Sequence, residues 1–288
     1  MKTSSSEIRL SIALVTRNRP DWLRKCLRSW RAQSIQPYEI VISDDSTNGY
    51  DVEVKKVASE FGCHYIKGPR RGLYANRNNA ALSCRGSHIM SADDDHTHPP
   101  YFTESVLDDV MCAPECVWTY SEKHPLHPNE PLHPVPELTP DNRIVPPKDR
   151  TRCRGIADGS TVYPRSIFDQ GLRYDETYQF GMLWYLWGQQ LSRNGYQIQF
   201  SDKTFVWHHT DSSLDRSDDV AWVEQQIECN LYVLLRNAVH ENKSPTGLAR
   251  ATVQIFRAWL RPLPPPGVKI VSRLPARSII RAVRNAVS

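Results

Sequence analysis

The sequence predicts an α/β fold built on a mostly parallel sheet with helices on its faces. Short apolar runs of strand length alternate along the chain with segments in which apolar residues recur at helical spacing. Polar clusters follow several of the predicted strands directly. With 40% hydrophobic and 24% charged residues, the 288-residue chain can bury a sizeable core. We therefore expect one large domain, or one domain with appendages.

The first part of the chain repeats a strand-then-helix unit. An apolar run at residues 8–15 predicts a strand, and the residues after Pro20 predict a helix with one apolar face. The same alternation continues to residue 91. The further elements predicted there are strands at residues 39–43, 64–67 and 88–91 and helices at residues 52–61 and 76–83.

A long irregular segment separates this part from the rest. Residues 121–150 are rich in proline and contain His124, His127 and His133 at irregular spacing, which predicts a flexible loop rather than a metal site. A Gly/Ser turn into a strand follows at residues 155–163. The remaining elements predicted are helices at residues 181–194, 219–240, 249–260 and 277–287 and a short strand at residues 205–207.

Three consecutive carboxylates, Asp93, Asp94 and Asp95, end the fourth predicted strand. Side chains alternate faces along an extended chain, so we expect Asp93 and Asp95 on one side and Asp94 on the other. Such a cluster is suited to a divalent cation. By itself it is also explained as an acidic turn before two prolines.

The ends of other strands favour a shared site. Residues 16–19 and 44–46 are polar and follow the first and second strands, as the triplet follows the fourth. In open α/β sheets, ligands bind beyond the carboxyl ends of the strands. An acidic turn that arose by chance has no reason to recur at the same end of each strand. We therefore expect the three clusters to form one site.

Charge is unevenly distributed along the chain. Residues 242–288 contain nine Lys or Arg and no Asp or Glu, whereas residues 1–241 carry 27 basic and 32 acidic residues, a net charge of −5. The last helix sets three arginines against four apolar residues, a pattern typical of helices that lie on membranes. These are Arg277, Arg281 and Arg284, opposed to Ile279, Ile280, Val283 and Val287. An anionic membrane surface is the preferred partner of this tail; an oligomer contact and nucleic acid are the alternatives.

Neither a leader nor a metal-binding cysteine motif is evident. No signal-type apolar segment and no run of about 18 apolar residues occurs, so we expect a cytoplasmic chain that is at most peripheral to the inner face of a membrane. The seven cysteines include no CxxC pair, which argues against a structural zinc site and a disulfide framework.

Taken together, the motifs resemble those of family-2 glycosyltransferases of the GT-A (Rossmann-like) fold, enzymes that use nucleoside diphosphate sugars. The resemblance runs from about residue 8 to residue 213. It implies a GT-A-like domain at residues 1–215 and a C-terminal helical extension at residues 216–288. The motifs are Thr-Arg-Asn-Arg-Pro at 16–20, Ser-Asp-Asp-Ser at 43–46, Gly-Leu-Tyr-Ala-Asn-Arg-Asn at 72–78, the acidic triplet, Gly-Ser at 159–160, Tyr-Asp-Glu at 174–176, Gly-Tyr at 195–196 and Val-Trp-His-His at 206–209.

The resemblance implies roles for the residues that would bind the donor. Thr16 and Asp45 match positions that hold the nucleobase, usually uracil, and Asn18 belongs to the same cluster as Thr16. Arg77 matches an arginine that reaches the nucleotide or its diphosphate, a role suited to a cation with several donors. Asp93 and Asp94 would face the ribose and the outer shell of the metal.

The resemblance also implies a divalent metal. Asp95 would bind it directly, and either His208 or His209 would complete the site. Oxygen ligands with one imidazole suit Mn²⁺ or Mg²⁺ better than Zn²⁺. The ion would stabilise the departing nucleoside diphosphate as a Lewis acid.

One part of the family pattern is missing. Inverting members usually carry an acidic pair before Gly-Tyr that deprotonates the acceptor, and the matching positions here hold Leu183 and Trp184. Asp158 is the first candidate for a relocated base and Glu176 the second. The alternatives are a retaining reaction, in which the leaving phosphate helps to accept the proton, and an acceptor more nucleophilic than a sugar hydroxyl.

The function expected is metal-dependent transfer of a sugar, from a UDP-type donor by preference, to an unidentified acceptor. The acceptor classes left open are a glycan, a lipid-linked intermediate, a protein or a small molecule. The rival functions are a nucleotidyltransferase, a non-catalytic nucleotide-sugar-binding protein and a polyanion-binding protein acting through the basic tail. A dinucleotide-binding oxidoreductase is disfavoured because no GxGxxG follows the first strand.

Overall fold

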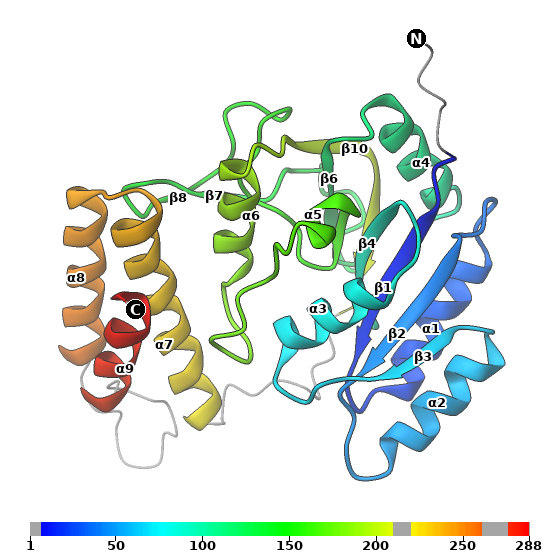
Figure 1. The fold of residues 1–288 in the computed structure, drawn as a ribbon, viewed down its shortest axis with the longest axis horizontal. Helices are drawn as coiled ribbons and strands as arrows, with labels where there is room; N and C mark the ends of the chain where they lie inside the picture. Colours follow the sequence, from blue (N-terminus) through cyan, green and yellow to red (C-terminus); the bar gives the residue numbers. More distant parts are fainter. Residues whose placement is uncertain (1–6, 210–219, 261–275, 288) are drawn as a thin grey trace.

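An eight-stranded sheet lies at the centre of the protein (Figure 1). The structure, a computed structural model, describes residues 7–209, 220–260 and 276–287. In sheet order the strands are β3 (His64–Lys67), β2 (Glu39–Asp44), β1 (Leu10–Thr16), β4 (His88–Asp93), β9 (Ser160–Pro164), β6 (Val117–Lys123), β10 (Ile198–His208) and β5 (His96–Thr97).

The sheet is mostly parallel, as predicted. β1 pairs in parallel with both β2 and β4, β2 with β3, and β6 with β10. β9 is inserted antiparallel between β4 and β6, and β5 pairs antiparallel with the end of β10. The carboxyl ends of β1, β2 and β4 consequently lie at one edge of the sheet, where their loops can meet.

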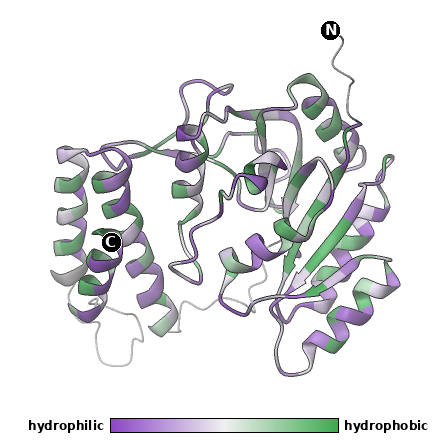
Figure 2. Ribbon diagram, viewed as in Figure 1, coloured by the Kyte–Doolittle hydropathy of each residue, from purple (hydrophilic) through white to green (hydrophobic). Residues whose placement is uncertain are grey.

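Helices cover both faces of the sheet because the central strands are apolar on both sides. In β1, Ile12 and Leu14 belong to one buried cluster while Ala13 and Val15 belong to the other. Figure 2 shows the apolar character of β1 and β2. The first cluster is completed by α1 (Pro20–Arg31), α2 (Tyr50–Glu60) and α4 (Phe102–Cys112), and the second by α3 (Leu73–Ser83), α5 (Ser166–Asp169) and α6 (Trp184–Arg193).

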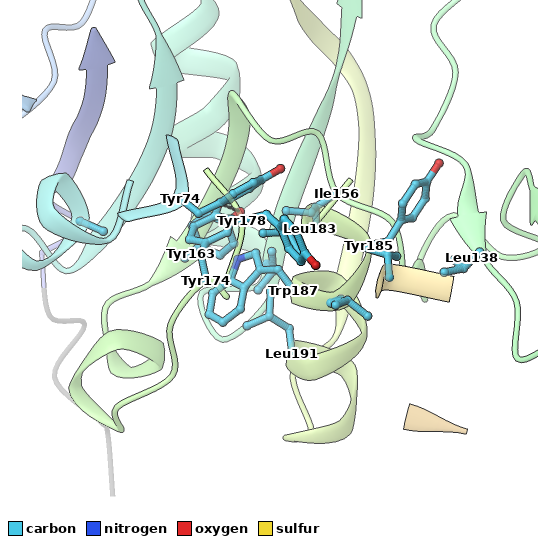
Figure 3. Packing of buried hydrophobic residues seen from close by; sticks show 14 of the residues in the cluster. Tyr74, Leu138, Ile156, Tyr163, Tyr174, Tyr178, Leu183, Tyr185, Trp187 and Leu191 are labelled. Atoms are coloured by element: carbon cyan, nitrogen blue, oxygen red, sulfur yellow. Dashed lines mark hydrogen bonds between the residues drawn. The ribbon is translucent and has the colours of Figure 1, made fainter. Parts of the chain in front are cut away.

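Aromatic side chains dominate the second cluster (Figure 3). The hydroxyls of Tyr163 and Tyr174 lie 2.8 Å apart, and the rings of Tyr174 and Trp187 are centred 4.8 Å from each other. These contacts bring α6 against the β9 side of the sheet.

The C-terminal helices lie together on one side of the molecule, with α6 between them and the sheet (Figure 1). Buried residues of these helices, including Leu231, Ala251 and Ala282, belong to the same apolar cluster as sheet residues. The expected boundary at residue 215 lies outside the described residues. The elements are α7 (Val220–Arg236), a π-helical turn η2 (Asn237–Glu241), α8 (Pro245–Leu260) and α9 (Ala276–Val287).

Three local predictions need correction. The expected loop at residues 121–150 contains the end of β6 and a hairpin of β7 (Glu137–Leu138) and β8 (Ile144–Val145). β10 is much longer than the predicted residues 205–207, because a bulge between Ser201 and Phe205 lets polar residues interrupt the apolar pattern. In addition, α4 and most of β6 were not predicted.

Among the described residues, no helix has both the length and the apolar character needed to cross a membrane.

Candidate functional site

The structure brings the three polar strand ends together. The Thr16 hydroxyl after β1 donates a hydrogen bond to Asp94 after β4, with 2.6 Å between the oxygens. The Asn18 amide N–H donates to the Ser46 hydroxyl after β2 at 2.7 Å. Both contacts join segments that are distant in sequence, so the edge of the sheet forms one continuous polar site.

The acidic triplet does not alternate in the way that an extended strand predicts. β4 ends at Asp93, and Asp94 and Asp95 form a turn before β5. Arg19 therefore reaches both turn residues, with Nε 3.1 Å from Asp94 Oδ2 and Nη1 2.9 Å from Asp95 Oδ2. Asp93 accepts a hydrogen bond from Arg77. Because β4 ends at Asp93, alternation along a strand does not place Asp95, and the expected pairing of Asp93 with Asp95 on one face stays a prediction.

Asp94 is fully buried between Thr16 and Arg19. Burial raises the pKa of Asp94, and the charge of Arg19 offsets this only in part. Because Thr16 and Arg19 both form hydrogen bonds with it, Asp94 holds the end of β4 and the end of β1 together. Its predicted contact with a ribose or a metal shell stays a prediction.

Asp95, His96 and His208 converge on one point. One ligand atom from each lies within 4.8 Å of the others. His96 Nε2 is 3.9 Å from Asp95 Oδ1, and His208 Nε2 is 4.0 Å from Asp95 Oδ2. The separations leave room for an ion that is bound by all three side chains.

The other ring nitrogens explain why both imidazoles face Asp95. His96 Nδ1 lies 3.2 Å from the Gly159 carbonyl oxygen, and His208 Nδ1 lies 3.1 Å from Glu122 Oε2. An acceptor at Nδ1 places a proton there and leaves Nε2 as the ligand atom, the arrangement found around histidines that bind metals.

The pocket has the features of an ion site. His96 is only 1% exposed, and within the described part of the chain its Nε2 has no hydrogen-bond partner. Buried polar atoms rarely go unpaired unless an ion, a water or a function accounts for them. Gly159 allows the close packing, because a Cβ there would lie 2.3 Å from Asp93 Oδ2 and 2.6 Å from His96 Cε1. These residues fit a divalent cation.

Two of these residues were missed in the sequence. His96 directly follows the triplet and could have been identified by extending the acidic motif by one position. Glu122 carries no comparable signal, since it lies in a segment that was assigned to a loop. His209 lies outside the cluster: its Nε2 is 2.8 Å from the Thr97 hydroxyl, and its ring packs on Trp22. Of the two predicted histidines, His208 is therefore the one placed to bind a metal.

Replacing Glu122 with alanine should weaken metal binding about 10- to 100-fold, because His208 loses the acceptor that orients its ring. Titration calorimetry with Mn²⁺ measures this change. Glu115→Ala, a change at an exposed residue on the loop before β6, is the control and should leave the affinity unchanged. Equal affinities in the two variants would contradict the orienting role.

Arg77 is buried between two carboxylates. Its side chain is 2% exposed, with Nη2 2.9 Å from Asp93 Oδ2 and Nε 3.3 Å from Asp158 Oδ1. Burial lowers the pKa of Arg77, but Asp158 and Asp93 outweigh this and raise it well above its usual value. The guanidinium thus offsets part of the charge of these two carboxylates, and its predicted contact with the donor diphosphate stays a prediction.

Asp158 is paired with Arg77 but is not closed off, since 15% of its side chain is exposed. Its Oδ1 is within ion-pair distance of Arg77 Nε, but the two groups are misaligned for a hydrogen bond. Burial raises the pKa of Asp158 to about 6, with Arg77 opposing the shift. A carboxyl with this pKa is mostly ionised at neutral pH and can still accept a proton.

Glu176 is engaged at both oxygens. Its Oε2 lies 2.9 Å from Arg71 Nη2, and its Oε1 accepts a hydrogen bond from Asn78 Nδ2 at 2.9 Å. These contacts fix the segment after Tyr174 against α3. Of the two candidate bases, Asp158 is therefore the better placed to accept a proton.

The predicted donor-binding residues lie at the rim of the same edge. Asp45 is buried and accepts a hydrogen bond from the Arg70 N–H at 2.7 Å. Asn18 Oδ1 accepts one from the Thr47 N–H at 2.8 Å. Both side chains hold neighbouring loops in place, and their predicted contacts with a nucleobase stay predictions.

No acid replaces the missing pair in α6. Leu183 is fully buried and Trp184 is half-buried against the apolar cluster. Their packing shows that these positions serve the core, so neither supplies a carboxyl to the site.

Comparison with protein families gives one match. The model described as Glycosyl transferase family 2 matches residues 11–172, more than half of the chain. The protein named "Uncharacterized glycosyltransferase YwdF" from Bacillus subtilis (strain 168) is 32% identical over 107 residues, 37% of this chain. The chain spans about 40% of the length of that relative.

Solved structures share the fold at low sequence identity. S. aureus TarS 1-349 in complex with UDP-GlcNAc is 15% identical, with a TM-score of 0.58 over 86% of this chain and 73% of that one. The mannosyltransferase PcManGT from Pyrobaculum calidifontis in complex with GDP-Man and Mn²⁺ is 14% identical, with a TM-score of 0.61 over 98% of this chain and 74% of that one. At these identities the likeness concerns the fold alone.

Proposed function

The chain belongs to glycosyl transferase family 2, and from this premise we propose that it transfers a sugar from a nucleoside diphosphate donor in a reaction that needs a divalent metal. The observation that carries the metal requirement is the convergence of Asp95, His96 and His208. In addition to Asp94, four carboxylates lie around this point, and only two guanidiniums, those of Arg19 and Arg77, oppose their charge. The four are Asp93, Asp95, Asp158 and Glu122. A divalent cation would balance the excess charge.

Mn²⁺ is the proposed ion, ahead of Mg²⁺. The cluster offers two imidazole nitrogens and one carboxylate, whereas Mg²⁺ prefers oxygen ligands and keeps several waters. Asp95, His96 and His208 would hold the ion, and Glu122 and the Gly159 carbonyl would orient the imidazoles. When bound, the ion supplies Lewis-acid stabilisation of the charge that develops on the leaving diphosphate.

We propose a UDP-type donor with its nucleobase toward Thr16, Asn18 and Asp45. This assignment rests on the resemblance at these positions and on their location beyond β1 and β2, the usual ligand side of such sheets. The family neighbours include complexes with a UDP-sugar and with a GDP-sugar, so GDP is the alternative.

Asp158 is the proposed proton acceptor. Its pKa of about 6 and the 15% exposure of its side chain support this role, and its carbonyl oxygen is fixed by the Ser91 hydroxyl at 2.6 Å. In this scheme Arg77 keeps Asp158 ionised while Asp158 accepts the proton of the acceptor hydroxyl. We expect activity to rise with pH through about 6, as the carboxyl loses its own proton.

Asp158→Asn should lower kcat about 10²- to 10⁴-fold, the usual contribution of a general base. Glu176→Gln, the control, should lower it much less, because Glu176 is tied to Arg71 and Asn78. The measurement is release of UDP or GDP from a panel of nucleotide sugars with Mn²⁺, with thermal melting to verify folding.

The panel also separates the alternatives. Loss in Glu176→Gln alone would identify Glu176 as the base. Full activity in both variants would mean that the proton leaves to a group on the substrates, as in a retaining reaction. Binding of nucleotide without release in any condition would reject the transferase and favour a nucleotide-sugar-binding protein.

A further inference from the structure

The last helix, α9, is attached to the protein by a face of small residues. Ser278, Ala282 and Ala286 are buried at four-residue spacing, which lets α9 pack closely against α7. Arg281 Nε lies 3.5 Å from Glu228 Oε1 of α7, and Asn285 Nδ2 donates to the Tyr178 hydroxyl at 3.3 Å. These contacts fix which face of α9 is turned outward.

The outward face carries an apolar stripe. Ile280, Val283 and Val287 follow each other at spacings of three and four residues, so they lie on one side of the helix. Ile280 is 66% exposed and Val287 58% exposed. Because the opposite face already packs on α7, the exposed stripe has no function in holding α9 to the protein.

A basic stripe runs beside the apolar one. Arg277, Arg281 and Arg284 repeat at the same spacing and are exposed. Within the described residues, no carboxylate forms an ion pair with Arg277 or Arg284. In sequence, no Asp or Glu occurs from residue 242 to the end. The outer face of α9 therefore combines apolar side chains with positive charge that its surroundings do not balance.

We propose that the outer face of α9 docks on an anionic phospholipid bilayer. Apolar side chains of this face would enter the interface while the arginines meet lipid phosphates, the mode of binding of basic amphipathic helices. A second copy of the chain fits less well, because pairing two such faces brings their unbalanced arginines together. Nucleic acid would use the arginines but leave the apolar stripe exposed.

α8, which packs on α7 as α9 does, has a similar composition. Val253 and Phe256 are exposed on it, together with Arg250 and Arg257. On the other side, α9 contacts Tyr178, which lies two residues after Glu176. The docking helix is thus directly connected to the segment that carries Glu176, and it would bring this rim of the site to the lipid surface.

The test is cosedimentation of the full chain with vesicles of phosphatidylcholine, with and without phosphatidylglycerol. We expect binding only to the vesicles that contain phosphatidylglycerol. Ile280→Asp/Val287→Asp and Arg277→Glu/Arg284→Glu should each weaken it about tenfold or more, since the first removes apolar contacts and adds negative charge, and the second reverses the charge of two arginines. The altered side chains are exposed, so the variants should fold and bind Mn²⁺ and nucleotide like the native chain.

Matched controls on α2 are Val52→Asp and Lys55→Glu/Lys56→Glu, which change exposed residues of the same types without affecting α9. They should bind vesicles like the native chain. Absence of vesicle binding, equal binding to phosphatidylcholine alone, or full binding by both α9 variants would overturn the proposal. So would a dimer, seen by analytical ultracentrifugation, that Ile280→Asp/Val287→Asp dissociates while vesicle binding persists. Because the readout is lipid binding, these outcomes do not depend on whether the proposed transferase activity is correct.

Discussion

Replacing Asp95 with asparagine is expected to abolish Mn²⁺-dependent nucleotide binding and to lower turnover by about three orders of magnitude. Asp95 is the one carboxylate in the cluster with His96 and His208, and asparagine keeps its shape but removes the charge that a cation needs. Loss of metal assistance at a leaving phosphate costs several kcal/mol, and each 1.36 kcal/mol or so is a factor of ten in rate. Titration with UDP in the presence and absence of Mn²⁺ measures the binding.

Two adjacent histidines provide a matched control: His208 is the last residue of β10, and His209 is the residue after it. His208→Ala should impair metal binding in the same way as Asp95→Asn, whereas His209→Ala should change it little. His209 is bonded to Thr97 and packs on Trp22, away from the cluster. Metal binding that survives in His208→Ala but fails in His209→Ala would show that the cluster is not the metal site.

Replacing Arg77 with methionine should destabilise the protein by about 3–5 kcal/mol, the usual loss when one partner of a buried ion pair is removed. The Asp93 and Asp158 side chains would then lie close together without the buried cation that separates them. Urea unfolding measures the change in the free energy of unfolding. Arg24→Met is the control: its ion pair with Glu60 lies at the surface, where solvent screens the charges, so we expect little or no loss of stability.

The pH dependence of the Arg77→Met variant provides a second check. Without the guanidinium, the largest influence left on both carboxyls is burial, which raises their pKa values in the folded state above those in the unfolded state. The folded state then binds more protons than the unfolded state, so the variant should regain stability as pH falls from 7 toward 5. A loss that is equal to that of Arg24→Met, or independent of pH, would contradict the structural role of Arg77.

Much of the fold could be predicted because local patterns and the core agree. β3 matches its predicted residues 64–67, and β2 extends one residue past its predicted end. β2 contains the β-branched run Ile-Val-Ile between polar residues, and β3 has Tyr65 and Ile66 between polar residues, so the signal is local. α4 and β6 were missed and β10 was predicted too short. In β10, a bulge at Ser201 breaks the apolar pattern, and sequence periodicity alone does not reveal such a break.

Part of the candidate site could also be predicted from the sequence, and part of it could not. The edge of the sheet, the acidic triplet and a late histidine were read from the chain, because parallel strands bring their carboxyl ends to one edge. The choice of His208 over His209 and the participation of His96 required the turn after Asp93. Glu122 required β6 to lie beside β10, which is a pairing between segments far apart in sequence.

By itself the sequence determined the family, the α/β architecture and the residues from which a metal site could be built. Only the tertiary structure decided how those residues pair: Arg19 with Asp94 and Asp95, and Arg77 with Asp93 and Asp158. The physical reason is that the sequence states the chemical type of each side chain, whereas the strength of an interaction between two charges depends on their distance and burial. Those quantities are set by the packing of strands and loops that the chain brings together from distant positions.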